Sequence, residues 1–483
     1  MSKLKNIIKQ LTEKDFQNIC VSLFDSSADK SAQLLKYMRD KQFSDSKIME
    51  ELDVNPNAYY TLRSRLNQKI EEYLILQMEN PRTDILKKVA SIQEIFFTKK
   101  KAIIITSLKK LEKELIDYDL SSELTNVYKY LKRLHINSPE QFHYSQLYNK
   151  HVAYTLALDK AEDLLAMYFR KYEDLFLQGK DYKNLELTLL RNEINNVCNL
   201  YQSHRLYVYQ SAVNIFHQLF VEPVVDGKLN DKESLEDIFE RVHNIIETYG
   251  QDTTYYHLRT VFEFLKYEYY EHYNLHSPAE KHYNEVNDYA SVLLTNYGFY
   301  TFSSRFLFSK IERNKRLDTL QELYDENKVL FVDYENDLHD VGRYLFYLTY
   351  RAICCMFVSK YDEASKLLNN LLNELSLKKY PEAQVEVKLL LSLQYCLMRD
   401  EELFNQLINS VQRQVRILGK EECEHIGVFI KIMKCSLNEK GKSRHAKITT
   451  LLAKLNSIEV KGFSILKMMK LEDDFVNQLC TGH

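Results

Sequence analysis

One stretch of the 483-residue chain, residues 345–372 (LFYLTYRAICCMFVSKYDEASKLLNNLL), constrains the fold more than any other. Its first half places apolar side chains at three- and four-residue intervals, which is the pattern of a helix with one buried face, at Leu345, Leu348, Ala352, Cys355 and Met356. The polar residues 360–363 interrupt this pattern, and a second apolar run with the same spacing follows from Ala364. Because two helices joined by a short turn cannot bury their apolar faces alone, the stretch predicts helix pairs that pack on neighbouring pairs.

Details of this stretch resemble the tetratricopeptide repeat. Ala352, where the two helices must approach closely, lies twelve residues before Ala364, and the sequence Tyr-Asp-Glu-Ala opens the second helix. The chain departs from the family pattern at three positions, where Leu348 replaces an aromatic residue, Cys355 a tyrosine and Ser376 the closing proline. The resemblance therefore implies the tetratricopeptide-like superfamily of helical repeats and not a standard repeat.

Similar starts of second helices recur along the C-terminal half. We align them at Ala279, Leu317, Ala364, Leu403 and Ala446, with intervals of 38, 47, 39 and 43 residues. These intervals exceed the standard repeat of about 34 residues and are typical of irregular helix pairs. The predicted fold is all-α, an α-solenoid of irregular tetratricopeptide-like helix pairs with an N-terminal helical module. The predicted domains are residues 1–80, 81–222 and 231–483, and the loop at 223–230 separates the last two.

Composition supports this fold class. The chain has only 10 glycines and 6 prolines, about 3% of its residues against a usual level of about 12%. Runs of alternating β-branched residues are missing, so we expect long helices, few turns and no sizeable sheet.

A second resemblance lies near the N-terminus. The segment 44–70 (SDSKIMEELDVNPNAYYTLRSRLNQKI) predicts a short helix, a tight turn at Asp53 and a longer helix that starts at Asn55-Pro56. It resembles the helix-turn-helix module of bacterial transcription regulators. The resemblance implies that the second helix would present these side chains to the DNA major groove: Asn57, Tyr59, Tyr60, Arg63 and Arg65.

Charge argues against DNA binding by this module. Residues 1–80 contain 12 basic and 12 acidic residues, whereas contact with phosphates usually requires a basic excess. The turn also carries Asp53 where the motif most often has glycine. Protein docking or a purely structural role is the preferred interpretation. Residues 81–118 hold nine basic and five acidic residues, an excess that could flank DNA or form a solvated helix face.

Tyrosine is concentrated in residues 249–300, which contain 11 of the 35 tyrosines. Consecutive tyrosines on a helix cannot all face inward, so some of them must be exposed or line a groove, and tyrosine suits a peptide-binding surface. The candidate groove residues are Tyr255, Tyr256, Tyr267, Tyr270 and Tyr273. The alternative is that these tyrosines fill core and boundary positions.

Motifs for chemistry are weak. A histidine pair at metal-ligand spacing occurs among His272, His276 and His282. The tripeptide Gly441-Lys442-Ser443 echoes the end of a phosphate-binding loop, but Ser436 stands where that loop needs its first glycine. The sequence contains no recognisable catalytic motif, and its eight cysteines form no CxxC pair. We therefore expect a non-enzymatic protein with no catalytic residue, metal or cofactor, in a reducing compartment.

The net charge of −3 creates no global attraction to nucleic acid or anionic lipid. The sequence shows no signal peptide and no membrane span, so the expected location is the cytoplasm, of a bacterium if the N-terminal resemblance holds. The predicted function is a protein- or peptide-binding scaffold or adaptor that uses a helical-repeat groove. The alternative is a transcription regulator with a DNA-binding N-terminal module and a ligand-sensing repeat domain.

Overall fold

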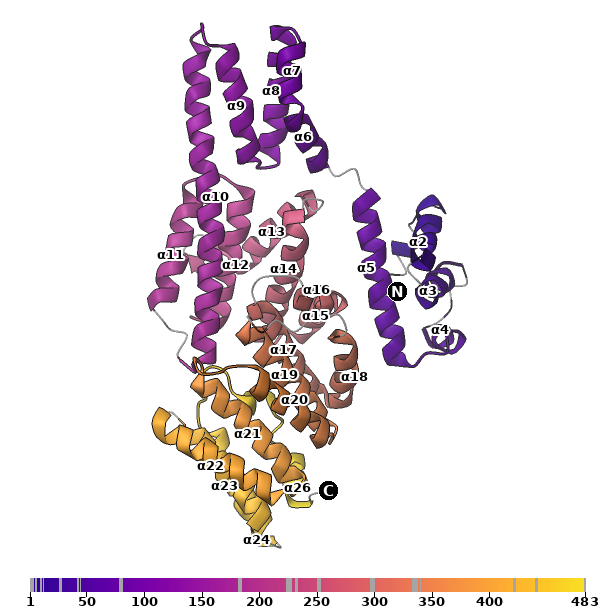
Figure 1. Cartoon of the computed structure of the whole chain (residues 1–483), viewed down its shortest axis with the longest axis vertical. Coiled ribbons are helices and arrows are strands. Elements are labelled where there is room, and N and C mark those ends of the chain that lie inside the picture. The colour runs from indigo at the N-terminus through magenta and orange to yellow at the C-terminus, as the bar shows by residue number, and fades with distance from the viewer. Residues whose placement is uncertain are drawn as a thin grey trace. The chain divides into compact units, whose positions relative to one another are not determined.

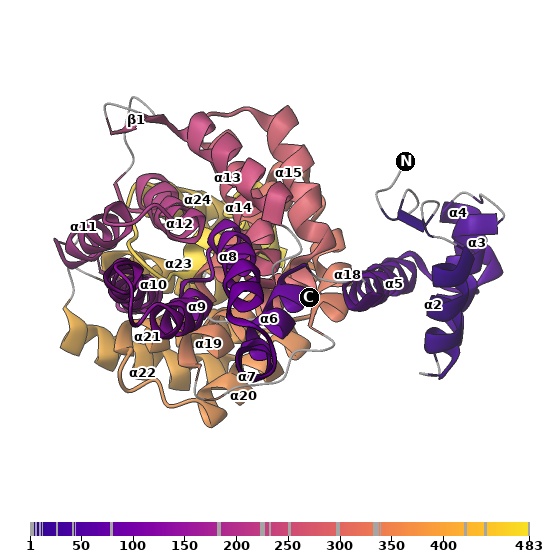
Figure 2. The same cartoon turned by 90° about the horizontal axis from the view of Figure 1, so that it is seen from above.

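The fold is given by a computed structural model of the chain (Figures 1 and 2). It describes residues 4, 7–8, 11, 13–25, 28–40, 43, 45–77, 81–180, 185–222, 228–230, 233–249, 253–295, 300–331, 338, 340–419, 423–438 and 442–481. These residues are almost entirely helical, which confirms the all-α class expected from the scarcity of glycine and proline. In the described part of the chain, no helix combines the length and apolar composition needed to cross a lipid bilayer.

The helices form two compact units. The N-terminal unit contains residues 1–165, 191–219 and 223–289, and the C-terminal unit contains residues 166–190, 220–222 and 290–483. This division differs from the predicted domain boundaries near residues 80 and 223–230, and residues 223–227 lie outside the described part. Three helices contribute residues to both units: α10 (Glu140–Leu177), α11 (Leu185–Asn199) and α12 (His204–Phe220). The 38-residue helix α10 is continuous (Figure 1).

The first helices have an apolar core of their own. They are α2 (Glu13–Asp25), α3 (Asp29–Asp40), α4 (Asp45–Glu51) and α5 (Pro56–Gln77). Apolar side chains at helical spacing meet in this core, among them Ile19, Leu34, Ile48, Leu66 and Ile70. Helix α5 starts as predicted, because Asn55 Oδ1 accepts a hydrogen bond from the Ala58 amide at 2.8 Å and Pro56 takes the first helical position.

A second cluster of helices follows in the same unit. It consists of α6 (Pro81–Ala90), α7 (Ile92–Thr98), α8 (Lys101–Asp117) and α9 (Ser121–Leu134). Their core is a stripe of isoleucine and leucine along α8 and α9, which pack side by side. The unit ends with a small antiparallel hairpin and three helices: β1 (Lys228–Asn230), β2 (Glu233–Ser234), α13 (Leu235–Tyr249), α14 (Thr253–His272) and α15 (His276–Asp288).

The C-terminal unit is built from helix pairs around one continuous apolar core. Its helices include α16 (Ala290–Thr295), α17 (Tyr300–Leu317), α18 (Leu320–Leu330), α19 (Val341–Phe357), α20 (Tyr361–Glu374), α21 (Pro381–Leu397), α22 (Glu401–Leu418), α23 (Glu424–Asn438), α24 (Lys442–Asn456), α25 (Ile465–Met468) and α26 (Asp473–Thr481). Neighbours in sequence pack on each other, namely α19 on α20, α21 on α22 and α23 on α24. Ala352 and Ala364 are fully buried, as expected for positions where α19 and α20 approach closely.

Six of the turns share one backbone geometry. Each contains a non-glycine residue with positive φ, between 47° and 62°: Asp53, Asp119, Asn274, Asp318, Ser359 and Arg399. The next residue then donates its amide to a carbonyl five positions earlier, as Lys360 does to Cys355 at 2.9 Å. From residue 274 to residue 399 these turns recur at intervals of 44, 41 and 40 residues. These intervals lie within the range of 38 to 47 residues between the second-helix starts aligned from the sequence.

The positions of these turns show that two of the second-helix starts aligned from the sequence, Leu317 and Leu403, need correction. Leu317 is the last residue of α17 and is 48% exposed, so the second helix of that pair starts after Asp318. Leu403 is 40% exposed, and its neighbour Phe404 takes the buried position. The buried residue lies five positions after the positive-φ residue in each pair, as at Ala279, Leu323, Ala364 and Phe404.

A close backbone contact fixes the segment after α24 to the end of α10 within the C-terminal unit. The Phe463 amide donates to the Phe176 carbonyl at 2.7 Å. A Cβ atom on Gly462 would lie 2.5 Å from the Gly179 Cα and 2.6 Å from the Phe176 carbonyl oxygen. Both glycines also have φ values in the left-handed region, 63° at Gly179 and 62° at Gly462. The contact therefore requires glycine at position 462.

Candidate binding site

The candidate groove tyrosines do not line one surface. Tyr255 is fully buried and Tyr267 is 3% exposed, so neither side chain is accessible to a partner in this structure. Tyr270 is half-buried, Tyr273 is 38% exposed, and the side chain of Tyr256 lies outside the described residues. Of the four candidate tyrosines whose side chains the structure describes, Tyr270 and Tyr273 retain accessible surface, and Tyr255 and Tyr267 serve the packing of α14.

Tyr270 belongs to a polar cluster that joins α14 to α15. Its ring stacks on His282 with the ring centroids 5.4 Å apart, and His282 Nδ1 lies 2.6 Å from Glu263 Oε2. Burial alone would raise the pKa of Glu263, but the contacts with His282 and Lys266 outweigh it and hold that pKa at about 2. This carboxylate is therefore an ionised structural anchor.

The turn between α14 and α15 divides the histidine motif. His272 ends α14 and His276 begins α15, with Asn274 in the left-handed conformation between them. His276 Nδ1 lies 3.3 Å from Glu271, and His282 contacts Glu263. Among the residues that the structure describes, no group of three or more His, Cys, Asp or Glu side chains could hold a metal ion.

The proposed DNA-contact residues lie on α5, but they differ in accessibility. Tyr59 is fully buried, and burial together with the Asp45 carboxylate raises its pKa. Tyr60 is 57% exposed, Arg65 is exposed and Arg63 is half-buried. The side chain of Asn57 lies outside the described residues. Tyr59 therefore belongs to the core of the first helices and is not positioned to contact DNA.

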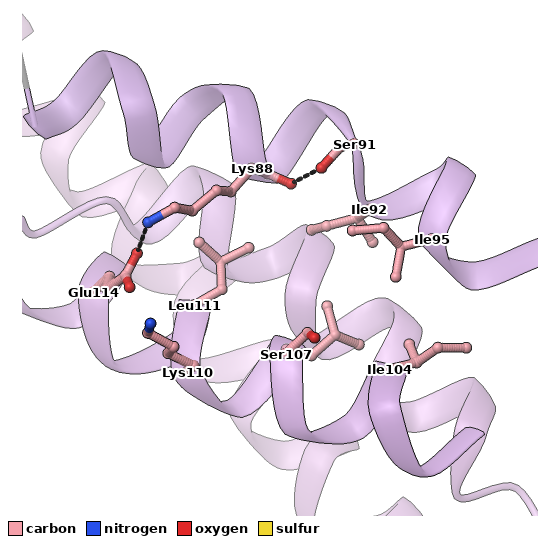
Figure 3. Close-up of a pocket in the computed structure, with 10 residues that line it drawn as sticks. Lys88, Ser91, Ile92, Ile95, Ile104, Ser107, Lys110, Leu111 and Glu114 are labelled. Carbon is pink, nitrogen blue, oxygen red and sulfur yellow. Dashed lines mark hydrogen bonds and ion pairs between the residues drawn. The ribbon is translucent and has the colours of Figure 1, made fainter. Parts of the chain in front are cut away.

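The structure reveals a different candidate, an apolar cleft formed by α6, α7 and α8 (Figure 3). Its cavity volume is about 250 Å³. The apolar lining consists of side chains from α7 and α8 that face one another: Ile92, Ile95, Ile104, Leu108 and Leu111. Ile95 is only half-buried, which leaves apolar surface open to a partner. A cleft of this kind can accept an apolar side chain, and each such burial contributes about 1.5–3 kcal/mol.

Polar side chains surround the opening of the cleft. Lys88 Nζ lies 2.8 Å from Glu114 Oε2 and closes one end, and this contact raises the pKa of Lys88 (Figure 3). Ser91 donates its hydroxyl to the Lys88 carbonyl at 2.9 Å. Ser107 and Lys110 complete the rim. The rim therefore offers hydrogen-bond donors and charge that could orient a bound peptide.

The surroundings of the cleft are basic and partly apolar. Six exposed lysines lie on α6, on α8 and in the connection between α7 and α8, at positions 87, 99, 100, 101, 109 and 113. Phe97 is 74% exposed and Ile103 is 53% exposed, at the junction of α7 and α8. An open apolar cleft beside exposed apolar side chains is typical of a protein-binding surface.

Sequence reasoning identified the basic character of residues 81–118 but missed the cleft. Ile92, Ile95, Ile104, Leu108 and Leu111 have the spacing of an ordinary buried helix face, so their pattern does not distinguish a closed core from an open one. The available signal in the sequence was an aromatic residue, Phe97, close to three consecutive lysines at 99–101. Such a combination can mark a binding surface.

Comparison with known proteins assigns no family to this chain, so the site is interpreted from its own residues. No protein-family model matches this chain, and neither a curated protein nor a solved structure matches it.

Proposed function

We propose that the chain is a non-enzymatic scaffold that binds a protein or peptide, with its helix pairs arranged as an irregular tetratricopeptide-like solenoid. The observation that carries the proposal is the open apolar cleft of α6–α8, with its rim of lysine, serine and glutamate side chains. The recurrence of one turn at intervals of 40 to 44 residues supports the repeat architecture. An apolar anchor in a pocket with a polar rim is the arrangement that dominates binding energy at protein interfaces.

The partner expected at this cleft is a peptide with an apolar anchor and acidic flanks. The anchor would occupy the space between Ile95, Ile104 and Leu108. Acidic flanking residues would face the exposed lysines of α8 and of the α7–α8 connection, which increases the association rate and selects against basic partners. This assignment places the interaction surface on the N-terminal unit and away from the tyrosines of α14.

A display library of random peptides, selected against the full chain, tests this function. We expect enrichment of peptides with an apolar residue between acidic ones, with affinities in the micromolar range. Ser107→Trp fills the cleft and should weaken the selected peptides about tenfold, the loss expected when one anchor is excluded. The matched control is Thr106→Trp, at the adjacent exposed position outside the cleft lining.

Two results would refute the proposal. One is a selection that yields no peptide above background. The other is an equal affinity for Ser107→Trp, Thr106→Trp and the unaltered chain, provided that circular dichroism shows all three to be folded.

A second candidate, DNA binding by the first helices, is favoured by one specific observation. In the turn between α4 and α5, Asp53 adopts the left-handed conformation. In the turn of a helix-turn-helix, this conformation is usually adopted by a glycine. Tyr60 and Arg65 are exposed on α5, and Arg63 is partly exposed. In this alternative the helices of the two units would sense a ligand.

Fluorescence anisotropy with random-sequence and selected duplexes tests the alternative at two salt concentrations. DNA binding predicts affinity that falls with salt and is weakened by Arg63→Ala and Arg65→Ala. Lys69→Ala on the same helix is the control, because that exposed lysine pairs with Glu72 at 3.0 Å. Affinity that is absent, or the same in all three variants, excludes α5 as a recognition helix.

A further inference from the structure

A basic cavity lies between α23 and α24 in the C-terminal unit. It has a volume of about 650 Å³ and is lined by side chains of both helices. Lys431 and Lys434 approach it from α23, one helical turn apart, and Lys447 approaches it from α24. Cavities of small-molecule sites in proteins fall between about 300 and 1,000 Å³. The space is thus sufficient for a small organic ligand.

The charge of this helix pair differs from that of the whole chain. Residues 424–456 contain seven lysines and arginines and two glutamates, in a chain whose net charge is −3. Glu424 is already paired with Lys454, at 3.0 Å and away from the cavity lining. None of the described residues that line the cavity is acidic. Lys431 and Lys434 therefore bring positive charge to a lining whose described residues include no carboxylate.

The other lining side chains suit a ligand that is partly polar and partly apolar. Asn438 and Ser443 add neutral hydrogen-bond donors at one end, and Ala446 and Leu451 supply an apolar wall. Arg444 belongs to a different contact, since it donates to the Ser436 carbonyl at 3.4 Å and to the Cys480 carbonyl of α26. Among the described lining residues, the charge of the cavity comes from Lys431, Lys434 and Lys447.

We propose that this cavity binds a small polyanion, a ligand that carries a phosphate or pyrophosphate group. Like charges one helical turn apart repel each other, and an anion placed between them converts this repulsion into attraction. Lysine ammonium groups act as point charges and bind phosphate oxygens without the planar geometry that arginine requires. The site is separate from the cleft on α6–α8.

The site is not a phosphate-binding loop of the kind that Gly441-Lys442-Ser443 echoes. Gly441 and the side chain of Lys442 lie outside the described residues, and Ser443 is the second residue of α24. The lysines that line the cavity stand outside that tripeptide, on helical positions of α23 and α24.

The test uses the full chain with inorganic pyrophosphate as the probe, by isothermal titration calorimetry and by thermal unfolding. We expect saturable binding that weakens as salt rises and a higher unfolding temperature with pyrophosphate. The double variant Lys431→Gln/Lys434→Gln should weaken binding about tenfold, as expected when two of three ammonium groups are removed. Lys378→Gln/Lys379→Gln removes the same charge from an exposed loop of the same unit and should stay within about twofold.

Three outcomes overturn the proposal: no saturable binding of pyrophosphate at millimolar concentration, equal losses in the two double variants, or tighter binding of a polyglutamate peptide than of pyrophosphate. The last result would assign the cavity to an acidic protein segment. If Lys431→Gln/Lys434→Gln does not fold, the single variant Lys447→Gln on the other helix replaces it, with an expected loss of at least about threefold.

Discussion

His425 and Glu386 form a buried pair in the C-terminal unit, with His425 Nε2 2.8 Å from Glu386 Oε1. The second oxygen of the same carboxyl accepts hydrogen bonds from the Ser464 hydroxyl and the Ile465 amide, both at 3.1 Å. Glu386 is 3% exposed and His425 is 9% exposed. One carboxyl group on α21 therefore connects α23 and the start of α25.

Removal of this carboxyl should destabilise the C-terminal unit strongly. Glu386→Ala leaves the His425 ring, the Ser464 hydroxyl and the Ile465 amide buried without their partner, at a cost of about 3 kcal/mol in the free energy of unfolding. Urea denaturation of the full chain measures the loss. Glu401→Gln, at an exposed position of α22, should change it by less than about 0.5 kcal/mol. Similar losses in both variants would contradict a role for the buried pair.

Glu173 should make stability depend on pH. Burial raises the pKa of this carboxyl from 4.5 to about 8, although the Thr301 hydroxyl and amide donate to it at 2.5 and 3.2 Å. Because the folded state then binds the proton more tightly than the unfolded chain, the stabilisation is complete below pH 4.5 and is lost as pH rises to about 8. The loss is on the order of 4 kcal/mol.

Glu173→Gln should abolish that decline, because the amide stays neutral at every pH. The measurement is the free energy of unfolding of the variant and of the unaltered chain between pH 5 and pH 8.5, in which the gap between them should widen in favour of the variant. Glu186→Gln is the control, since that carboxyl is 58% exposed and pairs with Lys171. A constant gap would show that Glu173 is ionised throughout.

Ser359 occupies the left-handed region with a φ of 60° at the turn between α19 and α20. Glycine adopts this conformation without steric cost, so Ser359→Gly should increase stability by about 1 kcal/mol. Ser359→Ala keeps the Cβ atom and should give no increase. Thermal unfolding of the two variants distinguishes them, and an equal effect of glycine and alanine would indicate that the turn carries no strain.

Arg399 holds the last helix in place. Its guanidinium donates to the Ser436 carbonyl at 2.9 Å and to the Leu479 carbonyl of α26 at 2.8 Å. Arg399→Ala should therefore increase the amide hydrogen exchange of residues 473–481 about tenfold, while the other helices stay protected. Arg413→Ala, at an exposed position of α22, is the control. An unchanged exchange rate in α26 would refute the anchoring role.

The pair α19–α20 was predictable because its apolar residues follow the helical period on both sides of a short polar turn. The turn at Asp318 was misplaced because its left-handed residue is an aspartate, and no glycine marks the end of α17. In the part of the chain that the structure describes, six turns use a non-glycine residue in this way. Where glycine is replaced by Asp, Asn, Ser or Arg, local sequence no longer marks the boundary of a helix.

The candidate binding surfaces were harder to predict than the helix pairs, because they depend on how the helices pack together. Tyr255 and Tyr267 are buried and Tyr273 is partly exposed, although the three residues are of the same type and belong to the same segment. Which of them is buried depends on the helices that pack around this segment. The cleft at Ile95 forms where α6, α7 and α8 meet, a property of the assembled helices and not of any one segment. Periodicity identifies an apolar face but not its partner.

The contact between Gly462 and Gly179 sets an order on the formation of the C-terminal unit. The segment 462–465 contributes the Ile465 amide to Glu386 and the Phe463 amide to the end of α10, two attachment points separated by most of the unit's sequence. A ribosome releases this segment only after every helix that it touches has emerged. A larger residue at position 462 would clash with the Gly179 Cα and the Phe176 carbonyl oxygen, and would therefore weaken the contact that joins these distant parts of the unit.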